Sequence, residues 1–322
     1  MFYGRRRGWR GDLSPSLDRC IARATPESDL VHVTAVYSWP LLSVARASRR
    51  SATPYLLSPR GSFAPAALAW RPWKKQLFGY VGGATALRRV AGFHATSEQE
   101  AADIRSQFPG ARVAIVPNGT DLPEDAQLTR LRAHGRDSSV LFLGRLHPHK
   151  NPELLLRAWA RTARTTPSGN LVLAGPDVTG LATSLKVLAS ELGCSERVCF
   201  TGAVEGEAKT SLLAKARVLV LPSKSENFGN VVAEALAHGT PVITTHGTPW
   251  AEVVSRGCGW WVASNEGALG SALEEALNMN GPRLQAMGAR GREWMAQSFS
   301  WDSVAEKMTA FYTEVLGVVW EG

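Results

Sequence analysis

The sequence predicts an α/β protein with two domains. The chain has 322 residues, of which 44% are hydrophobic and 20% are charged, an ordinary balance for a globular protein of this length. From residue 139 onward, apolar runs of four to six residues alternate with amphipathic helical patterns. This alternation is typical of parallel strands joined by crossover helices. The first part of the chain follows the same alternation with fewer strands, so we expect a smaller sheet there.

The apolar runs place the elements of both domains. The predicted strands are 29–34, 54–58, 91–95 and 111–116, then 139–143, 170–174, 197–201, 217–221, 241–245 and 259–262. Ser14 followed by Pro15 predicts a helix over about 15–24. Gly239 and Pro241 predict the end of a helix over 230–238. We expect domains over 1–122 and 139–298, a linker over 123–138, and a helix in 299–322 that packs back toward the first domain.

The positive charge is concentrated in the first domain. Net charge is +8, and residues 1–112 hold 17 of the 36 Lys and Arg residues but only 7 of the 28 Asp and Glu residues. This excess suits an anionic membrane surface, an anionic lipid-linked substrate or nucleic acid. Trp9 among arginines and the segment 70–80 (WRPWKKQLFGY) mix aromatic and cationic residues as interfacial segments do. The alternative is a solvated face with core tryptophans.

Several classes of protein are disfavoured. No apolar run approaches the roughly 18 residues of a membrane span, and the cationic start MFYGRRRGWRGD lacks the apolar block of a secretory signal, so we expect a cytoplasmic protein. No GxGxxG opens a helix after a predicted strand, and no nucleic-acid-binding motif is present. The cysteine spacing fits neither disulfides nor zinc, which predicts buried free thiols at Cys20, Cys194, Cys199 and Cys258.

The strongest candidate for a binding site is the segment 222–242, PSKSENFGNVVAEALAHGTPV. A buried strand ends there in a polar loop that turns into a helix, and ligands of open α/β sheets bind at the carboxyl ends of strands. We expect the helix N-terminus to offer backbone N–H groups to a phosphate or to sugar hydroxyls. The residues in this position are Asn227, Phe228, Gly229 and Asn230.

Two glutamates belong to the same segment. Glu226 and Glu234 are separated by seven residues, so both can line one cleft, where carboxylates accept hydrogen bonds from vicinal hydroxyls. The segment resembles the E-x7-E signature of the family 4 (group 1) retaining glycosyltransferases. The resemblance implies that Glu226 contacts the hydroxyls of the donor sugar and that Glu234 contacts the ribose of the nucleotide. The alternative is two solvated glutamates.

The segment 144–159, GRLHPHKNPELLLRAW, resembles the GR...K segment of the same family. By this resemblance Gly144 belongs to the donor site, and Arg145 and Lys150 bind the donor diphosphate and neutralise charge that builds on the leaving group. A surface-exposed cation pair is the alternative. The segments 171–176 and 199–204 resemble the strands whose ends flank the nucleotide base, which makes Gly202 and Val204 candidates for backbone contact with the base. A plain turn after the strand is the alternative.

The first domain resembles the acceptor-side domain of this family. Many members carry His-Gly after the second strand, where this chain has Arg60-Gly61. Arg60 could bind an anionic acceptor or a donor phosphate, or could pair with an acid. His94, at a strand end, is a candidate for a polar contact near the reacting sugar, with a buried, satisfied histidine as the alternative.

The resemblance implies the GT-B fold, two Rossmann-like domains that face each other across a cleft. Full members begin with a strand, a glycine-rich loop and further strand-helix units that this sequence lacks before residue 12. The resemblance therefore implies that the N-terminal domain lacks its first units, roughly sixty residues when each βαβ unit needs 30 or more. In the family that loop usually helps to close the site, so we expect its absence to impair turnover and acceptor binding rather than donor binding.

The sequence thus predicts a hexosyltransferase that moves a sugar from a nucleoside diphosphate sugar to an acceptor hydroxyl, and the resemblance implies that the anomeric configuration is retained. We expect no cofactor and no metal, because nothing resembles a DxD metal site. The basic first domain suggests a lipid-linked glycan acceptor in bacterial surface polysaccharide biosynthesis, with peripheral contact at the inner face of the membrane. Two alternatives are a catalytically impaired nucleotide-sugar-binding or scaffold protein and another GT-B enzyme, such as a nucleotide-sugar epimerase.

Overall fold

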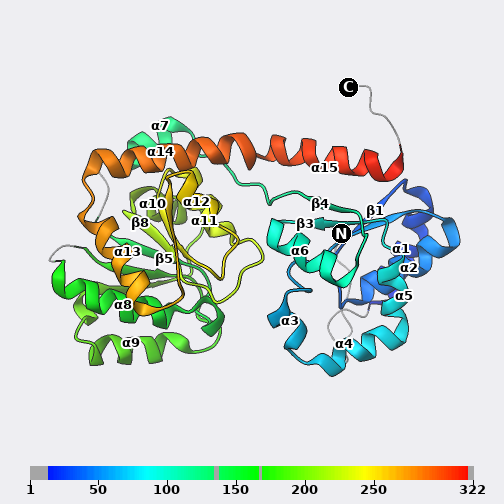
Figure 1. Ribbon diagram of the computed structural model, residues 1–322, viewed down its shortest axis with the longest axis horizontal. Helices are drawn as coiled ribbons and strands as arrows, with labels where there is room; N and C mark the ends of the chain where they lie inside the picture. The colour runs from blue at the N-terminus through cyan, green and yellow to red at the C-terminus, as the bar shows by residue number, and fades with distance from the viewer. Residues whose placement is uncertain (1–13, 134–137, 167–168, 318–322) are drawn as a thin grey trace. The chain divides into compact units, whose positions relative to one another are not determined.

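The computed structural model describes residues 14–133, 138–166 and 169–317 (Figure 1). The chain divides into two compact units. Unit 1 comprises Met1–Pro117 together with Val304–Gly322, and unit 2 comprises Asn118–Ser303. Each unit is an α/β unit built on a parallel sheet, which confirms the predicted fold class. The interfacial segment predicted around Trp9 and part of the predicted linker lie outside the described residues.

The sheet of unit 1 has four parallel strands in the order β1-β2-β3-β4. The strands are β1 (Val31–Thr34), β2 (Tyr55–Ser58), β3 (Gly92–Ala95) and β4 (Val113–Ile115), each inside a predicted range. Every residue of the central strands β2 and β3 is buried, as expected for strands covered on both faces. All four carboxyl ends therefore meet at one edge of the sheet.

Helices precede and connect the strands of unit 1, and the first of them begins at a capping serine. They are α1 (Pro15–Ala24), α2 (Trp39–Ser51), α3 (Pro65–Ala69), α4 (Pro72–Phe78), α5 (Ala84–Arg88) and α6 (Glu98–Gln107), with a 3-10 turn at Thr25–Glu27 and a π turn, η2, at Gly79–Gly83. The Oγ of Ser14 accepts a hydrogen bond from the Leu17 N–H, which confirms the predicted start of α1.

The C-terminal helix α15 (Trp301–Leu316) contributes most of its length to unit 1. Phe311 is buried, and a Cβ added to Gly92 would lie 2.7 Å from its ring, so only glycine lets strand β3 approach this helix so closely. Arg112 and Glu314 form an ion pair of 3.1 Å at the surface. The core of unit 1 is thus completed by residues from far along the sequence.

The sheet of unit 2 has six parallel strands in the order β10-β9-β8-β5-β6-β7. They are β5 (Val140–Leu143), β6 (Leu171–Ala174), β7 (Val198–Gly202), β8 (Val218–Leu221), β9 (Val242–Thr245) and β10 (Gly259–Val262). The chain adds strands on one side of β5 and then on the other, so the strand order reverses between β5 and β8. Open α/β sheets bind ligands outside the carboxyl ends of the strands at such a point.

Helices connect the strands of unit 2. They are α7 (Asp125–Leu131), α8 (Pro152–Thr165), α9 (Leu181–Glu191), α10 (Gly206–Lys215), α11 (Asn230–Ala237), α12 (Glu252–Ser255), α13 (Glu266–Asn278) and α14 (Gly281–Ser298), with 3-10 turns at Pro148–Lys150 and Ser195–Arg197. Helix α7 falls within the range expected to be a linker. Its buried Leu128 anchors it to the unit, and Arg132, just after it, donates to the Ala214 carbonyl at 2.9 Å.

The cysteines are free, as predicted, but not all of them are buried. Cys194 and Cys258 are buried, Cys20 is partly exposed and Cys199 is exposed. The prediction was wrong for Cys199 because β7 is the edge strand of its sheet and is not covered along its length. Within the described ranges, every helix is too short or too polar to cross a lipid bilayer.

Candidate functional site

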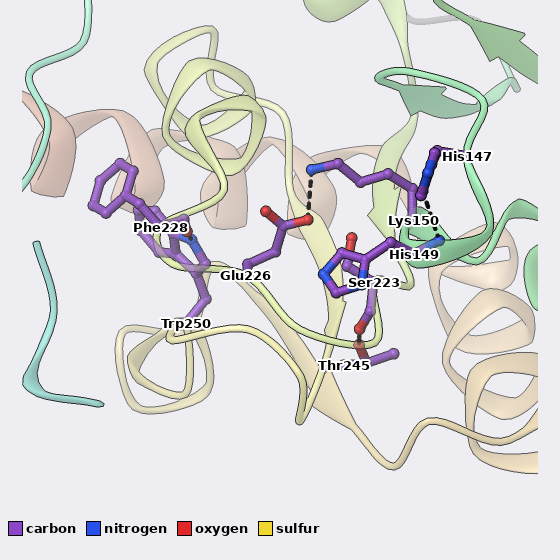
Figure 2. A network of polar contacts seen from close by, with 8 residues as sticks. All are labelled: His147, His149, Lys150, Ser223, Glu226, Phe228, Thr245 and Trp250. Carbon is purple, nitrogen blue, oxygen red and sulfur yellow. Dashed lines mark hydrogen bonds and ion pairs between the residues drawn. The ribbon is translucent and has the colours of Figure 1, made fainter. Parts of the chain in front are cut away.

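Two predicted residues meet where the strand order of unit 2 reverses. Lys150 ends the loop after β5, and Glu226 lies in the loop after β8 (Figure 2). The Lys150 Nζ lies 2.5 Å from the Glu226 Oε1, and the two side chains are only 20% and 11% exposed. Although the two residues are 76 positions apart in the sequence, the fold brings a cation and a carboxylate together, both largely protected from solvent. They lie at the edge of the sheet where ligands bind.

Backbone contacts hold Lys150 in place. It ends the 3-10 turn Pro148–Lys150, in which the ring Nδ1 of His147 accepts from the His149 N–H at 3.1 Å. The carbonyl of His149 accepts from the Lys224 N–H at 3.0 Å, which ties the loop after β5 to the loop after β8. Figure 2 shows His147 and His149 on the same turn as Lys150.

A third loop, after β9, supports Glu226. The Gly247 carbonyl accepts from the Glu226 N–H at 2.7 Å, and the Thr245 Oγ1 donates to the Ser223 carbonyl at 2.8 Å. The backbone of Gly247 lies so close to the loop after β8 that an added Cβ would be 2.5 Å from the Lys224 carbonyl oxygen. A side chain at Gly247 would therefore push the loop that carries Glu226 out of place.

We expect Gly247→Ala to lower the free energy of unfolding by about 1–3 kcal/mol, the usual cost of forcing an extra group into packed surroundings. Thermal unfolding followed by circular dichroism measures this change. Gly281→Ala is the matched control, because an added Cβ there meets open space at a helix start, and its stability should stay the same or rise by up to about 1 kcal/mol. Equal stability of the two variants would contradict the role assigned to Gly247.

Helix α11 begins beside Glu226. Gly229 is its N-cap with φ +81°, a conformation that favours glycine. Phe228 is buried, with its ring 5.2 Å from that of Trp250, and its carbonyl accepts from the Trp250 Nε1 at 2.5 Å (Figure 2). The Oδ1 of Asn230 accepts from the Asn118 Nδ2 at 2.8 Å. The Phe228 side chain is therefore an anchor in the core, and the segment directs the positive end of α11 to the site.

A pocket of about 300 Å³ opens at the carboxyl ends of β5, β6 and β7 and beside the start of α11. Its walls are formed by Leu143, Gly144, Gly175, Pro176, Ala203, Val204, Glu205, Lys209, Asn230, Val231 and Glu234. Four of the residues predicted to bind the donor lie in these walls: Gly144, Val204, Asn230 and Glu234. The Glu234 Oε1 lies 2.8 Å from the Lys209 Nζ, so the carboxylate predicted to contact the ribose has a cationic partner.

The other predicted residues are outside the walls of this pocket. Arg145 follows Gly144 and is exposed. The carbonyl of Gly202 accepts from the Gly175 N–H at 2.7 Å and from the Thr201 Oγ1 at 3.0 Å, so both of its lone pairs are used within the protein. Between the two candidates for contact with the base, the geometry favours Val204 over Gly202. Asn227 lies in the loop between Glu226 and Phe228 and is half-buried.

In unit 1, His94 belongs to a chain of hydrogen bonds that are buried or partly buried. Its Nε2 lies 2.7 Å from the Val116 carbonyl, which can only accept, so the Nε2 of neutral His94 carries the hydrogen. Its Nδ1 then accepts from the Ser58 Oγ at 2.7 Å. The Ser58 Oγ in turn accepts from the Nε2 of His32 at 2.7 Å, whose Nδ1 accepts from the Tyr312 hydroxyl at 2.8 Å. With both histidines neutral, the four hydrogen bonds thus run in one direction, from the Tyr312 hydroxyl to the Val116 carbonyl.

This arrangement favours the alternative that the sequence left open for His94. It is 3% exposed and both of its ring nitrogens are engaged within unit 1. Burial lowers the pKa of His94, and burial, followed by the charges of His94 and Arg60, lowers the pKa of His32 to about 4. We infer that His94 positions the carboxyl ends of β2 and β3 and does not contact a substrate.

The two histidines should make the protein less stable in mild acid. Each folded-state pKa is below the usual value of 6.5, so as the pH falls from 6.5 toward about 4 the unfolded chain takes up protons that the folded chain does not. We expect about 1–2 kcal/mol to be lost between pH 7 and pH 5, after allowance for partial solvent screening.

Chemical unfolding at the two pH values measures this loss. His32→Gln should reduce the pH dependence, whereas a control change at the exposed His246, His246→Gln, should keep it. The same pH dependence in all three proteins would show that the histidine chain is not its source.

Arg60 and Gly61 lie in the loop after β2. Arg60 is exposed and has φ +54°, and the Gly61 N–H donates to the Oε1 of Glu100 at 2.7 Å. Glu100 is buried, and its other oxygen accepts from the backbone N–H and the hydroxyl of Thr96 at 2.8 and 2.9 Å. The buried carboxylate thus fixes the loop and leaves the guanidinium of Arg60 at the surface, near the carboxyl end of β2.

Sequence reasoning missed four residues of the site: Lys209, Gly247, Trp250 and Asn118. Lys209 had a usable signal, because it lies in the first turn of α10, directly after the end of β7. The contacts of Gly247, Trp250 and Asn118 join loops that follow different strands, and no pattern in the sequence specified these pairings.

The sheet of unit 2 is parallel and doubly wound, and its reversal point has a cation, two carboxylates, a helix N-terminus and a pocket. This combination defines a protein of the nucleotide-binding α/β class. Comparison of the sequence with protein families makes this assignment specific. Residues 125–294 match the glycosyl transferases group 1 family, and residues 2–119 match the glycosyl transferase 4-like domain. The chain belongs to the group 1 glycosyl transferases.

Curated relatives carry one recurring name, D-inositol 3-phosphate glycosyltransferase. The protein of that name from Gordonia bronchialis is 33% identical over 239 residues, which is 69% of this chain and 52% of the relative. That from Nocardia farcinica is 35% identical over 222 residues, 65% of this chain and 48% of the relative. The matches thus span about half of the length of these relatives.

Solved structures of GT-B glycosyltransferases share the fold. Anabaena Alr3699/HepE in complex with UDP and glucose has a TM-score of 0.76 and 19% identity, covering 93% of this chain and 82% of that chain. The sucrose-phosphate synthase from Thermosynechococcus elongatus has a TM-score of 0.74 and 22% identity, covering 97% and 82%. The predicted family and the predicted pair of Rossmann-like domains are therefore confirmed.

Proposed function

We propose that this protein transfers a sugar from a nucleoside diphosphate sugar to an acceptor hydroxyl, with retention of the anomeric configuration. The observation that carries the proposal is the Lys150–Glu226 pair, a cation and a carboxylate 2.5 Å apart at the reversal point of the unit 2 sheet. A nucleotide sugar offers a partner to each group, since phosphate oxygens accept from the ammonium and sugar hydroxyls donate to the carboxylate. Without donor, the two groups neutralise each other.

The donor is assigned to unit 2. In this proposal the nucleoside occupies the pocket, with its ribose hydroxyls on Glu234 and its base beside the backbone of Val204 and Gly144. The diphosphate lies between the N-terminus of α11 and the two cations, Arg145 and Lys150. A helix N-terminus favours such a charge through its backbone N–H groups and its dipole.

The proposed chemistry has one leaving group and one nucleophile. The bond between the sugar C1 and the diphosphate oxygen breaks, and the acceptor oxygen bonds to C1 on the same face. The acceptor proton passes to an oxygen of the leaving diphosphate. Arg145 and Lys150 neutralise charge that grows on that diphosphate, so they act mainly in the transition state. The proposal assigns no metal, no cofactor and no covalent nucleophile, and a trapped glycosyl-protein adduct would contradict it.

Two similarities guide the choice of substrates. Alr3699/HepE has been solved with UDP-glucose, which makes a UDP-sugar the first donor to test. The curated relatives are named for an acceptor that carries a phosphate. Arg60, exposed at the carboxyl end of β2 in the basic part of the chain, suits such an anion. We propose an acceptor with a phosphate or diphosphate group, either a soluble polyol phosphate or a lipid-linked glycan at the cytoplasmic face of the membrane.

The test begins with calorimetric titration of UDP-, GDP-, ADP- and dTDP-sugars and continues with a transfer assay for each acceptor class, analysed by mass spectrometry. We expect one nucleotide to bind and one acceptor class to gain a sugar in the presence of that donor. Donor binding without transfer to either class would favour the nucleotide-sugar-binding or scaffold alternative. Alteration of the donor without any acceptor would favour an epimerase.

A further inference from the structure

Exposed aromatic side chains gather on one surface of unit 1. Trp70, Trp73, Leu77 and Tyr80 are 66%, 55%, 41% and 89% exposed. Trp73, Leu77 and Tyr80 follow the spacing i, i+4, i+7, so they share one face of α4 and its continuation η2. Phe78 faces the other way, with its ring 5.5 Å from that of Tyr37. The outward face of α4 is therefore apolar and lacks a covering element among the described residues.

Cations accompany these rings. The guanidinium of Arg71 lies 4.5 Å from the Trp70 ring centroid, and the Nζ of Lys74 lies 5.3 Å from that of Trp73. Both cations are exposed. The α4 surface, defined as Trp70, Arg71, Trp73, Lys74, Leu77 and Tyr80, thus pairs apolar rings with charges that can reach beyond them. Lys75 is different, because its Nζ donates to the carbonyls of Leu68 and Trp70 and so supports α3.

The sequence around this surface contains no negative charge. Residues 30–97 include nine Lys and Arg residues and no Asp or Glu. Helices α2, α4 and α5 and the turn η2 all fall in this stretch, and each packs against another member of the group. Figure 1 shows α3 and α4 on the side of unit 1 remote from α15. The α4 surface therefore lies in a wholly basic part of the chain.

We propose that the α4 surface binds the interface of an anionic phospholipid bilayer. Trp and Tyr favour the level of the lipid headgroups, where their rings are buried and their polar atoms stay hydrated. Arg71 and Lys74 would lie at the level of the lipid phosphates. An acidic protein could pair with the two cations. A lipid interface is favoured because it also provides an apolar layer for the exposed rings on which the cations are stacked. This proposal does not depend on catalysis, because it concerns binding in the absence of donor.

The experiment measures co-sedimentation of the whole protein with vesicles of phosphatidylcholine alone or with half phosphatidylglycerol. We expect at least tenfold tighter binding to the anionic vesicles, weakened by salt. Lys74→Gln/Tyr80→Ser should bind about tenfold more weakly, since one cation alone accounts for roughly fivefold at an anionic surface. Both side chains are exposed, so the variant should keep its thermal midpoint.

Arg283→Gln/Val254→Ser is the matched control, because it removes one exposed cation and one exposed apolar side chain from unit 2. It should bind as the wild type does. Brominated lipids should also quench the tryptophan fluorescence of the wild type more than that of Trp73→Ser. The proposal fails if both vesicle types bind equally, if the control loses as much binding as the test variant, or if the wild type self-associates through the α4 surface in the absence of lipid.

Discussion

Replacing Lys150 with alanine should lower kcat/KM for sugar transfer by about a hundredfold to a thousandfold. This is the usual effect of removing one preorganised group that stabilises charge in a transition state. The Lys150 side chain is 20% exposed, so little water can take the place of its ammonium, and the side chain of its partner Glu226 is even less exposed. The same change should weaken binding of the nucleoside diphosphate but leave binding of the nucleoside unchanged, because the nucleoside carries no phosphate.

Three further variants separate this effect from a general disturbance. Lys186→Ala removes an exposed lysine whose Nζ lies 5.5 Å from the Phe200 ring centroid, and it should leave kcat/KM within about twofold. Lys150→Arg keeps the charge and should recover part of the activity. Glu226→Gln removes the competing carboxylate, so it should tighten binding of the nucleoside diphosphate while transfer falls. Equal losses for Lys150→Ala and Lys186→Ala would refute the assignment.

Glu234→Ala should abolish the ability of the protein to distinguish a ribonucleotide from its 2′-deoxy analogue. In the wild type the ribonucleotide should bind about tenfold to a hundredfold more tightly, because a hydrogen bond to a charged group contributes about 1.5–3 kcal/mol. The Glu234 side chain lies in the pocket wall and is 30% exposed, and its Oε1 lies 2.8 Å from the Lys209 Nζ. Calorimetric titration of both nucleotides against both proteins gives the four affinities required.

Lys209 provides the internal comparison. Its ion pair with Glu234 is about one-third exposed, so Lys209→Ala should change affinity by less than about fivefold and should keep the preference for ribose. Glu191→Gln, at an exposed glutamate at the end of α9, should have no effect. If Glu234→Ala retained the wild-type preference for the ribonucleotide, the pocket would not be the site of the ribose.

The strands were predictable because each is a short apolar run with a polar boundary. β8 and β9 are buried at every residue, and together they consist of apolar residues and threonine. The meeting of Lys150 with Glu226 was predictable for a topological reason, since each follows a strand whose carboxyl end faces the same edge of the sheet. The sequence therefore predicts which loops converge at the site, but it does not predict which atoms are in contact.

What could not be predicted depends on contacts between side chains of distant segments. The polar stretch 123–138 contains helix α7 because one apolar residue, Leu128, is buried against the rest of unit 2. His94 is held by Ser58 and by the Val116 carbonyl, so its position at a strand end reveals neither its partners nor its burial. Gly247 lies opposite the carbonyl groups of Ser223 and Lys224, and these contacts follow from loop packing that no local pattern in the sequence specifies.

The two stretches of chain that form unit 1 impose an order on biosynthesis. Unit 2 is one continuous stretch, whereas strand β3 must wait for Phe311 to cover Gly92, and His32 must wait for the hydroxyl of Tyr312. At roughly 5–20 residues per second, translation of the intervening stretch takes on the order of 10–40 s. During that interval unit 2 can fold beside the ribosome, while the N-terminal stretch of unit 1 keeps apolar surface exposed. We expect chaperones to bind the chain mainly in this period.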